Sequence, residues 1–69
     1  MGLETVVYKV EATVRQGRKK PISSSREVEN IAIEEAKTLA RLMLAELLAQ
    51  YPGWSFAETA IHYNVFFTI

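Results

Sequence analysis

The chain has 69 residues, no cysteine, eight basic and eight acidic residues, and 49% apolar residues. This length allows one domain, residues 1–69, and the apolar content with only three Gly and two Pro excludes a disordered or low-complexity chain. The absence of Cys excludes a disulfide framework and a thiol nucleophile. Because a chain this short buries only about 60% of its unfolded surface, we expect a homo-oligomer, a dimer above all, to supply further stability.

No targeting or membrane segment is predicted. The N-terminus lacks a basic segment followed by an apolar one, which a secretory signal would have. The most apolar stretch, 39–49, is interrupted by Arg41 and Glu46 and is shorter than the roughly 20 residues that cross a membrane. We therefore expect a soluble, cytoplasmic protein that does not bind membranes.

Residues 3–15 alternate between apolar and polar side chains, which is typical of a half-buried strand. The apolar face consists of Val6, Tyr8, Val10, Ala12 and Val14. Gln16 and Gly17 then suggest a tight turn, because Gly adopts positive φ at low cost. The sequence leaves open whether 18–23 returns as a short strand or forms an irregular basic loop. A strand there would be an edge strand, since Pro21 cannot donate a ladder hydrogen bond.

A long helix is predicted over residues 25–50. Ser24 and Glu27 have the spacing of a capping box at its start, and Pro52 and Gly53 end it. At 1.5 Å per residue such a helix is roughly 37 Å long. Its predicted core stripe is Val28, Ala32, Ala36, Leu39, Met43 and Leu47. Both flanks of this stripe are also apolar, and one small sheet cannot cover them all.

The last segment, 54–69, alternates again and predicts a second long strand, whose final Phe67-Thr68-Ile69 we expect to be docked in a sheet or an interface. The predicted fold is therefore α+β. A small antiparallel sheet of two long strands, with or without a short edge strand, packs against one long α-helix in the order β-(β)-α-β. Self-association would cover the outer sheet face and the unpaired edges.

No catalytic, cofactor or metal site is predicted. His62 is the only histidine, and Glu58 on the same strand lies about 13 Å away at the backbone. That distance is too long for a hydrogen bond that would orient the imidazole. Glu34 and Glu35 are adjacent on the helix and point about 100° apart, which is poor geometry for chelation.

The sharpest polar feature is the basic segment 15–20, which carries Arg15, Arg18, Lys19 and Lys20. These side chains could contact an acidic protein surface or the phosphates of a nucleic acid. Tyr51, Trp54 and Phe56 could stack on bases, but the predicted helix places them at the opposite end from this segment.

The surplus of apolar residues favours a non-enzymatic module that self-associates and binds another macromolecule, in the first place a protein. We expect its apolar contacts at Leu44, Leu48, Trp54, Phe56 and Phe66, and its contacts to an acidic partner at the four basic residues of 15–20. The alternative is a nucleic-acid-binding dimer that uses the basic loop 15–20.

Overall fold

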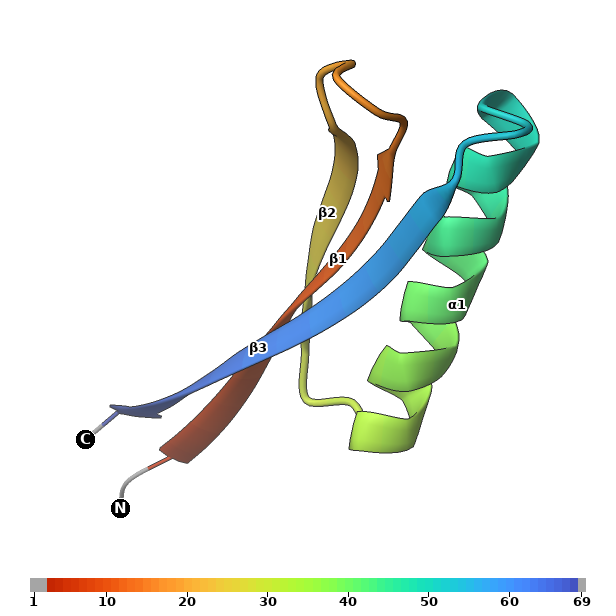
Figure 1. The fold of residues 1–69 in the computed structure, drawn as a ribbon. Coiled ribbons are helices and arrows are strands. Elements are labelled where there is room, and N and C mark those ends of the chain that lie inside the picture. Colours follow the sequence, from red (N-terminus) through yellow and green to blue (C-terminus); the bar gives the residue numbers. More distant parts are fainter. Residues whose placement is uncertain (1–2, 69) are drawn as a thin grey trace.

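The structure is a computed structural model that describes residues 3–68, with side chains described from residue 4 to residue 66. Three strands and one helix follow in the order β1-β2-α1-β3 (Figure 1). Their bounds are β1 Leu3–Arg15, β2 Ile22–Glu29, α1 Ile33–Gln50 and β3 Phe56–Thr68. This is the predicted α+β domain with a small antiparallel sheet and one long helix.

The strands form one antiparallel sheet in the order β2-β1-β3, so β1 lies in the centre. Its register pairs Val10 with Arg26 on one side and with Ile61 on the other. The predicted face of β1 is confirmed, because Val10, Ala12 and Val14 are fully buried under α1. From α1 the core receives Ala36, Ala40, Met43 and Leu47. The predicted stripe is therefore correct in its middle and C-terminal part.

The predicted start of the helix is wrong. Residues 22–29 form strand β2, and the N-cap of α1 is Ala32, which makes no side-chain capping bond. Ser24 and Glu27 are paired with Ala12 and Lys9 of β1, so they form no capping box. Val28 packs against the core from the strand, whereas Ala32 is exposed. Pairing with the central strand outweighs a local capping pattern, because it packs Ile22 and Val28 against the core while every second residue of β2 bonds its backbone to β1.

Asn30 ends β2. It adopts φ +53, a left-handed conformation that Asn tolerates better than most residues. Its N–H donates to the Val6 carbonyl at 2.9 Å, and its Oδ1 accepts the Val6 N–H at 3.2 Å. These two bonds extend the β1–β2 ladder by one pair and turn the chain toward α1.

The connection between β1 and β2 is longer than a two-residue turn. Gly17 has φ +51, as a turn at this position requires, and the Lys19 N–H donates to the Gln16 carbonyl at 2.9 Å. Each of the two alternatives for residues 18–23, a short strand and an irregular loop, is partly correct. Residues 18–21 belong to the loop, Pro21 precedes the strand, and Ile22 and Ser23 begin β2.

The helix is shorter than the two long strands and shorter than the roughly 37 Å predicted for it. With 18 residues α1 is about 27 Å long at 1.5 Å per residue. The 13-residue strands β1 and β3 extend over about 43 Å at 3.3 Å per residue. Figure 1 shows β1 and β3 continuing past the start of α1 toward the two chain ends. Here the sheet narrows to a two-stranded ribbon, in which residues 3–5 pair only with residues 66–68. Ile69 and the side chains of Phe67 and Thr68 lie outside the described part, so the docking expected of them is not addressed.

Candidate interaction surfaces

The first surface is the free edge of the sheet along β3. Both backbone polar groups of Val6 are directed to the β2 side, as its two bonds with Asn30 establish. In an antiparallel sheet the backbone groups alternate between the two neighbours, so the odd-numbered residues of β1 bond to β3. Their partners on β3 are even-numbered, for example His62 opposite Lys9. The N–H and C=O groups of the odd-numbered residues therefore point out of the sheet at the β3 edge: Ala57, Thr59, Ile61, Tyr63 and Val65.

The side chains on β3 are unusually apolar for an exposed edge. Four large hydrophobic residues of the strand are exposed, at 48% for Phe56, 67% for Tyr63, 39% for Val65 and 54% for Phe66. Phe56 and Phe66 lie on the outer face, and Tyr63 and Val65 lie on the face that carries α1. Within the described side chains, Glu58 and His62 are the charged or titratable residues of β3 apart from Tyr63. An apolar edge of this length is a ready template for another strand.

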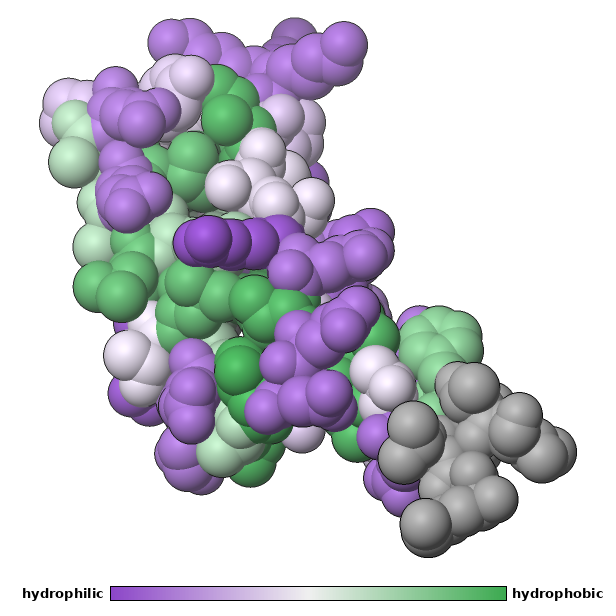
Figure 2. All heavy atoms as spheres, turned by 180° about the vertical axis from the view of Figure 1, so that it is seen from behind, coloured by the Kyte–Doolittle hydropathy of each residue, from purple (hydrophilic) through white to green (hydrophobic). Residues whose placement is uncertain are grey.

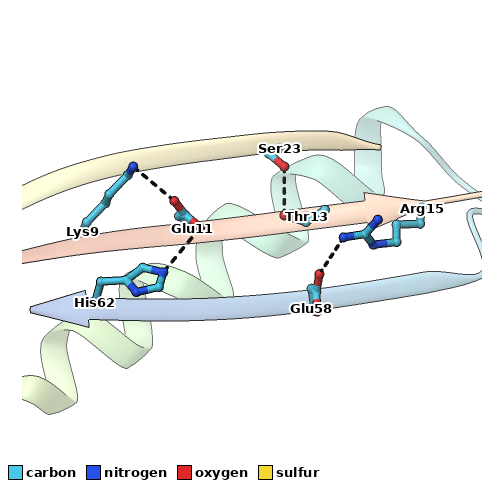
Figure 3. A network of polar contacts seen from close by, with 7 residues as sticks. All are labelled: Lys9, Glu11, Thr13, Arg15, Ser23, Glu58 and His62. Atoms are coloured by element: carbon cyan, nitrogen blue, oxygen red, sulfur yellow. Dashed lines mark hydrogen bonds and ion pairs between the residues drawn. The ribbon is translucent and has the colours of Figure 1, made fainter. Parts of the chain in front are cut away.

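The second surface is the outer face of the sheet, which carries a polar network across all three strands (Figure 3). Lys9 Nζ lies 3.3 Å from Glu11 Oε1, and His62 Nε2 lies 3.7 Å from Glu11 Oε2. Thr13 and Ser23 share a hydroxyl hydrogen bond of 2.9 Å between β1 and β2. His62 is thus matched with Glu11 across the ladder and not with Glu58. All these groups are at least partly exposed, and exposed pairs of this kind stabilise a fold only weakly.

The third surface is the hairpin end of the molecule, where the basic segment lies. Arg15 is tied to Glu58 by an ion pair of 3.3 Å, so it is partly neutralised. Lys19 Nζ lies 5.9 Å from the centre of the Trp54 ring, within reach of a cation–π contact. The Ser55 N–H donates to Gln16 Oε1 at 2.7 Å and joins the two loops. Hydrophilic side chains crowd this end at the top of Figure 2.

The predicted position of the aromatic residues relative to the basic segment is wrong. Tyr51 and Trp54, with ring centres 5.1 Å apart, lie at the hairpin end beside the basic segment and not at the opposite end. The error follows from the misplaced helix start, because a helix from residue 25 would have put the basic segment at its N-terminus. Once β2 carries the chain back down the sheet, the C-terminus of α1 returns to the hairpin.

The structure separates the five predicted apolar contact residues. Phe56 and Phe66 are exposed on β3, and Leu48 is exposed on α1. Leu44 and Trp54 are partly buried and pack against the core, and Trp54 lies before β3 and not on its outer face. Sequence reasoning missed Tyr63 and Val65, which are exposed although they follow the core period. They lie at and beyond the start of α1, which begins later than predicted, so the helix leaves them uncovered.

Two negative observations apply to the described residues. Among residues 3–68, no helix is long and apolar enough to cross a membrane. Within the same range, no group of three or more His, Cys, Asp or Glu side chains is arranged to hold a metal ion. Comparison with known proteins found no family model, no curated protein and no solved structure that matches the chain.

Proposed function

We propose that the chain is a non-enzymatic interaction module that associates with itself through the β3 edge and then binds another macromolecule, in the first place a protein. The observation that carries the proposal is the free edge of β3, with its outward row of backbone groups and its exposed Phe56, Tyr63, Val65 and Phe66. A second strand laid along this edge would satisfy the backbone and cover the apolar side chains together.

The ribbon beyond α1 supports the same proposal. An isolated two-stranded ribbon is at best marginally stable in water, and here residues 3–5 and 66–68 have only each other as ladder partners. Association along β3 would add a third strand to part of this ribbon.

Multi-angle light scattering on a size-exclusion column tests self-association directly. We expect a mass of twice the 7.8 kDa of the chain at tens of micromolar protein. A mass of one chain at that concentration would overturn the proposal.

A second candidate function, nucleic-acid binding, rests on the hairpin end. Arg18, Lys19 and Lys20 lie there, and Lys19 Nζ is 5.9 Å from the centre of the half-buried Trp54 ring. Cations that track phosphates, together with an aromatic ring that stacks on a base, are the elements of single-strand recognition. For an oligonucleotide of deoxythymidine, this candidate predicts an affinity that falls steeply as salt rises. Replacement of Lys19 and Lys20 by Gln should reduce that affinity and the salt slope. Unchanged mobility of the oligonucleotide at low salt would contradict this candidate.

A further inference from the structure

We propose that two copies of the chain pair their β3 strands antiparallel about a two-fold axis at Ile61, so that two three-stranded sheets become one of six strands. This inference rests on the proposed self-association and adds its geometry. In this register Ile61 faces Ile61 of the second copy, Thr59 faces Tyr63, Ala57 faces Val65, and Phe56 faces Phe66.

The backbone permits this register. In an antiparallel ladder the residues that exchange both hydrogen bonds face one another. At the β3 edge the residues with outward N–H and C=O groups are odd-numbered. A two-fold axis at Ile61 places Thr59 opposite Tyr63 and Ala57 opposite Val65, so each outward residue meets another outward residue. The edge is thereby fully paired over residues 57–65.

The side chains fit this register because, after Phe56, small residues in the first half of β3 face large residues in the second half. The early residues Ala57, Thr59 and Ala60 are small, whereas the later Tyr63, Val65 and Phe66 are large. Antiparallel pairing about Ile61 sets each small residue against a large one. On the outer face it pairs Phe56 with Phe66 twice, a cross-strand aromatic contact that stabilises sheets.

The helix also fits. It packs mainly over β1, where Val10, Ala12 and Val14 are fully buried, and less over β3, so its axis lies about one and a half strand spacings, ~7 Å, from the proposed two-fold axis. Two such helices would be antiparallel and ~14 Å apart, which is wider than direct helix packing and leaves room between them for large side chains on the facing flanks. At 100° per residue, Ile33, Leu44 and Leu48 share one flank of the buried stripe. In the right-handed crossover expected between the parallel strands β2 and β3, this flank faces the β3 edge.

The same arrangement covers the residues that α1 leaves exposed. Tyr63 and Val65 lie near and beyond the start of their own helix, on the face that carries it. Their proposed neighbours, Thr59 and Ala57 of the second copy, lie on the same face toward the C-terminal end of that copy's α1 and are themselves exposed in a single copy. Pairing along the edge would therefore bring Tyr63 and Val65 against Thr59 and Ala57 and lessen the exposure of all four.

Charge favours an antiparallel over a parallel arrangement. The hairpin end carries Arg18, Lys19 and Lys20, whereas the opposite end carries Glu29 at the end of β2 and Glu34 and Glu35 in the first turn of α1. Antiparallel association sets the basic end of each copy beside the acidic end of the other. A parallel arrangement would place like charges beside each other, and their repulsion would disfavour that arrangement.

Cysteine pairs test the register, because the native chain has no cysteine. The double variant Thr59→Cys/Tyr63→Cys should form a covalent dimer on mild oxidation at tens of micromolar protein, seen on a non-reducing gel. Facing residues in such a ladder have Cα atoms about 4.5–5.5 Å apart, within the range that a disulfide spans. Ala57→Cys/Val65→Cys should crosslink in the same way and serves as an independent second pair. Within one copy the two cysteines of the first pair are about 13 Å apart along the strand and cannot bond to each other.

The single variants are the matched controls. Thr59→Cys alone and Tyr63→Cys alone should stay uncrosslinked, because in this register each residue is about 13 Å from its own copy across the axis. Absence of crosslinking in both double variants, with light scattering still showing a wild-type dimer, would overturn the register and leave self-association intact. Efficient crosslinking of Ala60→Cys alone would also overturn it, since that result places Ala60 on the axis. A monomeric wild-type chain would instead overturn the proposed self-association itself.

Discussion

The two edges of this sheet differ in length and in chemistry. The β2 edge has eight residues, follows Pro21, and exposes serine, arginine and glutamate. The β3 edge has 13 residues and exposes Phe56, Tyr63, Val65 and Phe66. Short strands, charges and proline are the means by which proteins protect free edges from pairing. By this standard β2 is protected and β3 is not.

The difference indicates where a partner strand is expected. Both edges present the same kind of outward backbone groups, so the backbone alone does not distinguish them. The side chains do, because pairing at β2 would bring Arg26, Glu27 and Glu29 into an interface, whereas pairing at β3 buries mainly apolar surface. The proposed association would then owe its specificity to the protection of one edge as much as to the apolar character of the other.

We expect the largest effect on the dissociation constant of the proposed dimer from a proline substitution on the β3 edge. The backbone N–H of Tyr63 points out of the sheet at the β3 edge, so Tyr63→Pro leaves the β1–β3 ladder bonded while it removes the outward donor. Two such losses per dimer, with their orphaned acceptors, should raise the dissociation constant about 100-fold or more. Light scattering should then show a monomer at tens of micromolar.

Ser25→Pro is the control on the other edge. Ser25 is paired with Glu11, whose backbone groups point to β3, so the Ser25 N–H also points out of the sheet. This variant has the same conformational cost and should remain a dimer. Dissociation by Ser25→Pro and not by Tyr63→Pro would reverse the assignment of the two edges.

The second effect comes from the aromatic side chains of β3. Phe66→Ala removes two proposed Phe56–Phe66 contacts per dimer, each worth about 0.5–1.5 kcal/mol beyond the area buried. We therefore expect a dissociation constant about 10–100 times higher by sedimentation equilibrium. Leu42→Ala, at an exposed apolar residue of α1 on the flank away from β3, should change the constant by less than about twofold. Equal effects of the two variants would mean that any exposed apolar residue contributes, and that β3 has no special role.

Much of this architecture could be predicted from the sequence, and the failures have physical causes. Period-two alternation identified β1 and β3 because their core faces are continuous, from Val10 to Val14 in β1. The predicted secondary structure was wrong for residues 25–29 because the few apolar positions of 22–29, such as Ile22 and Val28, are compatible with a strand as well as with a helix. The serine and glutamate between them match a capping box, and only pairing with β1 decides the outcome.

The candidate surfaces depended on β1 being central, which the sequence predicts only if residues 18–23 return as a strand, a question that the sequence left open. Phe56 and Phe66 were predicted as contact residues from their type and outward period. That they lie on a free edge follows from β1 being central, a property of the whole sheet. Tyr63 and Val65 share the period of the buried Ile61, so nothing local marks them as exposed.

A smaller effect is expected where β2 ends. Asn30→Ala loses the hydrogen bond to the Val6 N–H and strains φ +53, and we expect it to lower the free energy of unfolding by about 2 kcal/mol in urea. Asn30→Gly keeps the conformational freedom and loses only the side-chain bond, so about 1 kcal/mol is expected. If Asn30→Ala and Asn30→Gly lowered the free energy of unfolding equally, the left-handed conformation of residue 30 would cause no strain in the alanine variant.

The smallest effect should come from Glu58, the acidic residue of β3. Its ion pair with Arg15 spans 3.3 Å between two side chains that are each about half exposed. Exposed pairs contribute about 0–1 kcal/mol, so Glu58→Gln should lower the free energy of unfolding by less than about 0.5 kcal/mol. This small loss should disappear at 0.5 M salt, where a Debye length of roughly 4 Å screens the pair. The dissociation constant of the dimer should change by less than about twofold, because Gln keeps an oxygen that can accept a hydrogen bond from Asn64 of the second copy. A tenfold weaker dimer would instead assign the β3 association to charge and not to backbone pairing and apolar contact.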